Sequence, residues 1–139
     1  SSGVSVIQRV LAVNHGHLDT LILTGLSDTL LFTVAQEITT CKVLTGLSVR
    51  AGTLTPKSLP VLADILLSCP LLQGFNLGEN NGFQLENEEG SMRFVRAVRG
   101  SENLGTLLMP RREWVDERLA SLLDSVAAAV ERDLRIVYD

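Results

Sequence analysis

Five short stretches of the chain alternate apolar and mixed positions in a repeating Leu-x-x-Leu-x-Leu pattern. They read LDTLIL from Leu18, LTGLSV from Leu44, LQGFNL from Leu72 and LGTLLM from Leu104, followed by a partial copy, LRIV, near the end of the chain. A period of two residues is typical of a β-strand that buries one face. The pattern therefore predicts five strands, the last of them over residues 134–138.

Between these stretches the apolar residues recur every three or four positions, which predicts helices. The first such stripe spans residues 27–40, where Ser27 or Asp28 is placed to cap the helix N-terminus. Thr55 followed by Pro56 predicts the start of the next helix, because proline is favoured at the first helical position. Helix and strand are thus expected to alternate along the whole chain.

The helical stripes repeat at a constant distance from the strands. The residues ten and then six positions ahead of the leading leucine are apolar in the three central units: Val34, Leu62 and Phe94, and then Ile38, Leu66 and Val98. The outer units fit only when shifted by one residue, so we expect the terminal loops to differ in length by one. Self-similarity of this kind is typical of a repeat protein.

These repeats resemble those of leucine-rich-repeat proteins, in the long, helix-containing subclass typified by ribonuclease inhibitor. The resemblance covers residues 4–139, whereas Ser1-Ser2-Gly3 resembles a cloning remnant. It implies an α/β fold, with one leucine-rich-repeat domain of about four and a half units that begins with a partial helix. The expected shape is a right-handed solenoid, a short curved horseshoe with a parallel β-sheet on its concave face and α-helices on its convex face. The positions assigned to the repeat are Leu18, Leu21, Leu23, Leu44, Leu47, Val49, Leu72, Phe75, Leu77, Asn80, Leu104, Leu107 and Met109.

The chain departs from the family pattern at one polar position. That pattern places Asn or Cys three residues after the third apolar residue, where the side chain bonds neighbouring loops. Asn80 alone obeys, while Leu26, Gly52 and Arg112 stand at the equivalent places. A regular asparagine ladder is therefore not expected. A short and irregular array of this kind also resembles the repeat domain that caps actin filaments in tropomodulins, or a fragment of a longer horseshoe.

Composition narrows the classes of function. The 139 residues amount to one domain's length, and the net charge of −4 with few aromatic residues argues against a nucleic-acid partner. Apolar runs end well before about 18 residues and the first residues lack a signal-peptide pattern, so we expect no membrane insertion. Two cysteines and no Asn-x-Ser/Thr acceptor predict a reducing, cytoplasmic location. Cys41 and Cys69 share one repeat position, where burial is expected rather than redox chemistry.

The resemblance implies a protein partner bound on the concave face, through side chains between the leucines of each strand. The middle row and its rim supply the predicted protein-binding residues: Ile22, Ser48, Arg50, Asn76, Glu79, Leu108, Arg111 and Tyr138. Gly46 and Gly74 share the neighbouring row with Thr20, Thr106 and Ile136, and indicate either a shallow groove or a tolerant surface.

Two further regions are secondary candidates. Phe83 and Leu85 lie in the longest connection, where they either contact a partner or tuck beneath the loop. The second region is a basic stripe on one helix that either meets an acidic partner or pairs with neighbouring glutamates: Arg93, Arg96 and Arg99, near Glu88 and Glu89.

The sequence carries no motif of catalysis or cofactor binding. His15 and His17 lack further ligands at the spacing of a zinc site, and no Walker A, dinucleotide-binding or Gly-x-Ser-x-Gly motif occurs. We therefore expect no enzyme, no cofactor and no metal, and predict an interaction module that acts as a scaffold or regulatory adaptor. Two alternatives stay open. One is a structural segment or cap of a longer array or filament, and the other is a GTPase-activating domain, which needs an exposed arginine such as Arg50 or Arg111.

Overall fold

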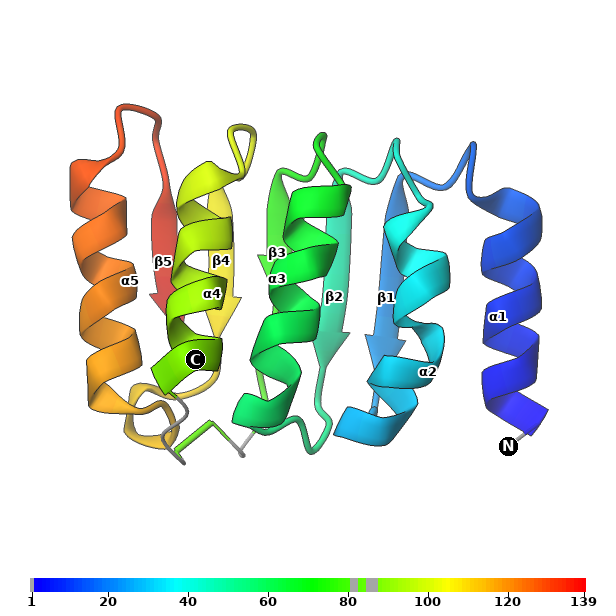
Figure 1. Cartoon of the computed structure of the whole chain (residues 1–139), viewed down its shortest axis with the longest axis horizontal. Coiled ribbons are helices and arrows are strands. Elements are labelled where there is room, and N and C mark those ends of the chain that lie inside the picture. Colours follow the sequence, from blue (N-terminus) through cyan, green and yellow to red (C-terminus); the bar gives the residue numbers. More distant parts are fainter. Residues whose placement is uncertain (1, 81–82, 85–87) are drawn as a thin grey trace.

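The structure, a computed structural model, describes residues 2–80, 83–84 and 88–139. Helices and strands alternate along this part of the chain (Figure 1). The helices are α1 (Ser2–Asn14), α2 (Asp28–Thr39), α3 (Leu59–Ser68), α4 (Glu88–Gly100) and α5 (Glu117–Ala129). The strands are β1 (Thr20–Thr24), β2 (Gly46–Arg50), β3 (Gly74–Asn76), β4 (Thr106–Met109) and β5 (Arg135–Tyr138). Two 3-10 turns, η1 (Pro56–Ser58) and η2 (Arg112–Trp114), precede α3 and α5.

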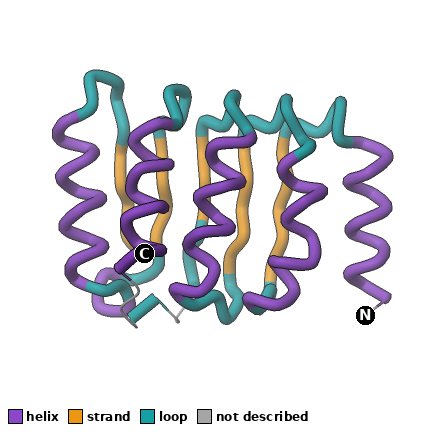
Figure 2. The backbone as a smooth tube through the Cα atoms, in the orientation of Figure 1, coloured by secondary structure: helices purple, strands orange, loops and turns teal. Residues whose placement is uncertain are grey.

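The strands form one parallel sheet in the order β1-β2-β3-β4-β5. Each strand after β1 pairs with the strand of the preceding unit, and the helices lie side by side on one face of the sheet (Figures 1 and 2). One strand and one helix cannot bury each other's apolar surface alone, but stacked units share a continuous core. The predicted α/β class with a parallel sheet is confirmed.

The last strand lies one residue away from its predicted register. Val137, rather than Tyr138, pairs with Leu108, and Tyr138 pairs with Met109. Because side chains alternate between the two faces of a strand, this slip moves Tyr138 to the helix side of the sheet. Tyr138 therefore does not belong to the row in which the repeat pattern placed it.

The predicted register of β5 was wrong because a leucine is displaced in the last unit, and not because a loop has an unusual length. Leu123 precedes Arg135 by the same twelve residues that separate Phe94 from Thr106, and Arg135 pairs with Thr106. The strand is thus in frame with its helix, and Leu134 stands one place later than the leading leucine of the other units. The predicted difference in length of the C-terminal loop is wrong.

Polar side chains at the helix starts tie neighbouring units together. Ser27 caps α2 as predicted, accepting a hydrogen bond from the backbone N–H of Leu30 at 3.3 Å. Thr55 caps η1 rather than α3, so the predicted helix opens as a 3-10 turn with Pro56 in its first position. The Asp28 carboxylate accepts hydrogen bonds from the Thr55 backbone N–H at 2.9 Å and hydroxyl at 2.6 Å.

The repeat positions supply the core between sheet and helices. Those from Leu23 to Met109 are at most 7% exposed, whereas Leu18 and Leu21 are only partly buried because β1 is an edge strand. Cys41 and Cys69 are free thiols within this core. Burial raises the pKa of Cys41 and, with the neighbouring Cys41 thiol, raises that of Cys69 to about 11.

Asn80 is buried and joins two consecutive loops. Its side-chain oxygen accepts hydrogen bonds from the backbone N–H groups of Gly52 at 3.1 Å and Leu54 at 3.4 Å. Its amide nitrogen donates to the carbonyl oxygens of Val49 and Leu77, both at 2.9 Å. One side chain thus satisfies backbone groups of two units that lack partners within a helix or strand.

Candidate interaction surface

One face of the sheet is turned away from the helices, and we call it the open face. Strand side chains that alternate with the buried core residues project from this face. Strand register places Ile22, Ser48, Asn76, Leu108 and Val137 in its central row. Ile22 is 65% exposed and Val137 is 38% exposed, while Asn76 and Leu108 are half-buried. Apolar side chains are therefore accessible at both ends of the row.

Ser48 lies in the central row as predicted, but its neighbours cover most of its surface. It is only 9% exposed. Ile22 and Asn76 flank it on the neighbouring strands, and both have longer side chains. Within the described residues, the Ser48 hydroxyl oxygen has no hydrogen-bond partner. A buried hydroxyl left in this state costs about 1–3 kcal/mol.

The row of residues next to the central row contains two glycines and therefore few side-chain atoms. Gly46 and Gly74 are paired, and they share their row with Thr20, Thr106 and Arg135. A Cβ added at Gly74 would meet no atom within 4 Å, and one added at Gly46 would meet only the Thr20 side chain, at 3.8 Å. The space above these glycines is therefore open to a side chain from a partner.

A polar rim borders the open face where the strands end. Arg50 and Glu79 form an ion pair there. Asn76 accepts a hydrogen bond from the backbone N–H of Gly78 at 2.8 Å, and the Asp139 carboxylate accepts one from the backbone N–H of Glu79 at 2.7 Å. The structure thus gathers three predicted residues, Arg50, Asn76 and Glu79, and adds Asp139 to them.

Asp139 is the rim residue that sequence reasoning missed. Its hydrogen-bond partner lies 60 residues earlier in the chain, beyond the range of any local pattern. A Cβ added at Gly78 would lie 2.8 Å from an oxygen of the Asp139 side chain, so the glycine leaves room for this close approach. The only sequence signal for this contact is Gly78, a glycine just after β3. It does not indicate that Asp139 approaches there.

The turns at this rim share an uncommon backbone conformation. Gly25, Ala51 and Glu79 follow the first three strands and have φ angles of 76°, 55° and 61°. Glycine adopts this left-handed region readily, whereas other residues do so at a cost of about 1–2 kcal/mol. Arg111, at the equivalent place after β4, has a φ of −50°. Backbone strain is therefore concentrated beside the Arg50–Glu79 pair.

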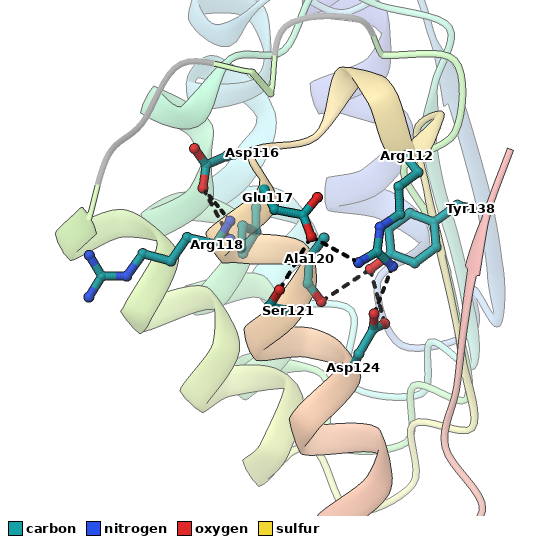
Figure 3. A network of polar contacts seen from close by, with 9 residues as sticks. Arg112, Asp116, Glu117, Arg118, Ala120, Ser121, Asp124 and Tyr138 are labelled. Carbon is teal, nitrogen blue, oxygen red and sulfur yellow. Dashed lines mark hydrogen bonds and ion pairs between the residues drawn. The ribbon is translucent and has the colours of Figure 1, made fainter.

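Tyr138 serves the fold rather than the open face. Its hydroxyl lies 3.2 Å from the Asp124 carboxylate and 3.4 Å from the Ala120 carbonyl oxygen (Figure 3). The Arg112 guanidinium lies 4.9 Å from the centre of the Tyr138 ring and donates to Asp124 at 2.7 Å. Burial raises the pKa of Tyr138, and the Asp124 charge raises it further. This network fastens β5 to α5, so the predicted position of Tyr138 on the concave face is wrong.

Arg111 and Arg50, the two arginines named for a GTPase-activating function, both have neighbours within the chain. The Arg111 guanidinium lies 5.2 Å from the centre of the Trp114 ring and 3.9 Å from the Glu113 carboxylate. Arg50 is paired with Glu79. Arg111 is exposed, so it remains accessible at the edge of the molecule.

Phe83 is not an exposed contact in the long connection after β3. It is fully buried, and its carbonyl oxygen accepts a hydrogen bond from the backbone N–H of Asp116 at 3.0 Å. Of the two alternatives for this residue, the one in which it tucks beneath the loop is confirmed. Leu85, its predicted companion, lies outside the described residues.

The basic stripe of α4 is paired differently from the prediction. Arg93 forms an ion pair with Asp64 of α3 at 2.9 Å, and Glu88 pairs with Arg118 of α5 at 2.8 Å. These pairs join helices instead of linking residues within α4. Arg96 and Arg99 are exposed.

No cluster of three His, Cys, Asp or Glu side chains able to hold a metal occurs among the described residues. In the same part of the chain, no helix is both long and apolar enough to cross a bilayer. The sequence matches no protein-family model and no curated protein.

Proposed function

We propose that the chain is a leucine-rich-repeat module of the long, helix-containing kind, a solenoid that binds a protein partner through the open face and its rim. It acts as a scaffold or regulatory adaptor and catalyses no reaction. The observation that carries this proposal is the open face itself. There Ile22, which is 65% exposed, lies near the paired glycines Gly46 and Gly74.

The physical basis is preorganisation. Side chains on hydrogen-bonded strands lose little conformational entropy on association, so more of the contact energy appears as affinity. The centre of the face is uncharged, and charges occur at the rim in Arg50, Glu79 and Asp139 and at the β5 edge in Arg135. A partner that places an apolar side chain over Gly74 and a polar group against the rim matches this distribution.

The variant that tests this proposal fills the open face without disturbing the fold. Gly74→Trp introduces bulk where a Cβ meets no atom within 4 Å, and Gly74→Ala is its matched control. Arg50 and Asn76 are poorer targets because both make hydrogen bonds that hold the rim. Each variant is immobilised and used for affinity capture with quantitative mass spectrometry, after thermal melting has shown that it folds.

We expect a specific protein to be retained by the wild type and by Gly74→Ala, and lost with Gly74→Trp. Direct titration of that protein should show affinity reduced about tenfold or more, which corresponds to about 1.4 kcal/mol. Equal retention by all three proteins contradicts binding through the open face.

A second candidate function is that of a structural segment within a longer repeat array. Two features of the β1 end of the sheet favour this candidate. On α1, Val6, Val10 and Val13 are 55%, 48% and 73% exposed and form a stripe at helical spacing. Val6 and Val10 hold the same repeat positions as Leu122 and Val126 of α5, which face the preceding helix, α4. The valine stripe of α1 therefore matches a surface that packs against another helix elsewhere in the chain.

The strand at the same end is equally unprotected. Within the described sheet, β1 pairs with β2 alone and carries no charge along Thr20–Thr24. At the opposite end, β5 carries Arg135 and is followed by Asp139. Charged residues commonly protect edge strands from further pairing, so the β1 end is the better site for another unit.

A fusion experiment tests this second candidate. A copy of residues 55–78, one unit of the chain itself, is placed ahead of α1. If the β1 end accepts a unit, the melting temperature rises because the valine stripe and the strand edge become buried. The rise should disappear when the chain carries Val6→Lys and Val13→Lys. An unchanged melting temperature in both fusions counts against this candidate.

A further inference from the structure

Helices α4 and α5 lie side by side on the helix side of the molecule (Figures 1 and 2). Side chains of both helices line a groove between them. Its volume is about 360 Å³. Met92 and Val95 of α4 and Leu122 and Val126 of α5 line it with apolar side chains. Val95 and Val126 are 6% and 8% exposed, so they belong to the floor.

The groove is closed at one end and open at the other. The ion pair between Glu88 and Arg118 bridges the first turns of α4 and α5 at 2.8 Å. Toward the opposite end, a second hollow of about 410 Å³ shares Arg99 and Ala129 with the groove. The two hollows are thus adjacent along the helices.

One wall of the groove is positively charged. Arg96 and Arg99 are exposed on α4, and among the described residues neither guanidinium has an ion-pair or hydrogen-bond partner. The other wall carries the small residues Ser125 and Ala129. This local charge stands out in a chain whose net charge is −4. The second hollow carries both signs of charge, with Glu102, Glu131 and Arg132 in its lining, so the uniformly positive wall is confined to the stretch between Arg96 and Arg99.

We propose that this groove binds an acidic amphipathic helix of a partner protein, independently of the open face. The partner's apolar side chains enter the groove, and carboxylates spaced one helical turn apart meet Arg96 and Arg99, which are themselves three residues apart. Helix α4 has 13 residues. A groove of that length, about 20 Å, accommodates a helix of three to four turns.

The shape of the site favours a helix over a membrane surface. The apolar residues lie at the bottom of a groove between two helices, where a single protruding stripe of side chains can reach them and a flat bilayer cannot. The guanidiniums stand on one wall only, which matches a helix that carries acidic residues beside its apolar stripe.

A display library of single helices tests the proposal, with the immobilised wild-type chain as the target. The affinity of the selected helices is then measured on two double variants that reverse the same number of charges. Arg96→Glu/Arg99→Glu alters the groove. Arg9→Glu/Lys57→Glu is the matched control, because both residues are exposed and lie outside α4 and α5. Thermal melting establishes that both variants fold.

We expect the selected helices to combine a leucine-type stripe with Asp or Glu. Their affinity should fall about tenfold or more in Arg96→Glu/Arg99→Glu, with little change in the control. The proposal is overturned if no groove-dependent helix is selected, if acidic residues are not enriched, or if both double variants lose affinity equally. Co-sedimentation with phosphatidylserine vesicles, if it depends on Arg96 and Arg99 when no helix binds, overturns it in favour of a membrane.

Discussion

The Asp139 carboxylate accepts a hydrogen bond from the backbone N–H of Glu79 at 2.7 Å, although 60 residues separate the two in the chain. The contact links the end of β5 to the turn that follows β3, with β4 between them in the sheet. It positions the backbone of Glu79, whose side chain pairs with Arg50. The rim of the open face is therefore assembled from three units.

Replacing Asp139 should loosen this rim. Asp139→Ala removes the acceptor for the Glu79 N–H, and we expect a loss of about 0.5–1.5 kcal/mol in the free energy of unfolding. Urea denaturation monitored by circular dichroism measures the change. Asp133→Ala is the matched control, since Asp133 is also exposed. Equal effects of the two variants would show that the hydrogen bond to Glu79 contributes nothing measurable.

Removing the Ser48 hydroxyl should stabilise the protein. The hydroxyl oxygen is buried without a partner among the described residues, and Ser48→Ala relieves its desolvation cost. We expect a gain of about 1 kcal/mol in urea denaturation. Ser58→Ala is the contrasting control, because the Ser58 hydroxyl donates a hydrogen bond to Asp28 and its removal should destabilise. A loss of stability in Ser48→Ala would mean that the hydroxyl has a partner.

Relieving the left-handed turn after β2 should also stabilise the protein. Ala51 has a φ of 55°, so Ala51→Gly removes strain that exceeds the added entropy of glycine in the unfolded chain. The expected gain is about 0.5 kcal/mol. Ala35→Gly, placed within α2, should instead cost about 1 kcal/mol. Thermal and urea denaturation of both variants check the opposite signs, and a destabilised Ala51→Gly contradicts the prediction.

The buried Cys69 thiol should make stability depend on alkaline pH. Burial is the largest cause that raises its pKa to about 11 from an ordinary value of 9.0, and the neighbouring Cys41 raises it further. The folded state thus favours the protonated thiol. Its stabilising contribution is complete below pH 9.0 and is lost as the pH rises toward about 11.

Urea midpoints measured across that pH range test the prediction. We expect the wild-type midpoint to fall more steeply than that of Cys69→Ala, which has no thiol to ionise. The folded wild type should also react slowly with iodoacetamide below pH 9.0, because the reactive thiolate is rare. Parallel midpoint curves for the two proteins would mean that Cys69 ionises alike in the folded and unfolded chain.

Local periodicity accounts for most of the predicted fold. Strands and helices alternate as the two apolar periods indicate, and Ser27 caps α2 because capping depends on residues within one turn. The starts of α3 and α5 were less predictable. Each follows a 3-10 turn, whose short period is hard to distinguish from a first helical turn.

The candidate site was only partly predictable, because exposure depends on what lies on neighbouring strands. Ile22 and Ser48 hold equivalent places in the repeat, yet one is 65% exposed and the other 9%. For Phe83 the sequence leaves contact with a partner and burial beneath the loop both open, and only the fold decides for burial. Likewise, the arginine stripe of α4 leaves an acidic partner and pairing with nearby glutamates both open, whereas Arg93 pairs with Asp64 of the preceding helix, α3.

The amino-acid sequence by itself determined the alternation of helices and strands and most residues of the core, because periodic burial is a local property repeated in every unit. The parallel sheet was expected from the resemblance to leucine-rich repeats. Only the tertiary structure decided that Tyr138 faces α5 and that Asp139 meets Glu79. A slip of one residue exchanges the two faces of a strand, and contacts between distant units depend on how those units stack. The leucine pattern of the last unit, displaced by one residue, indicated the wrong face for Tyr138 until the pairing of β5 with β4 was known.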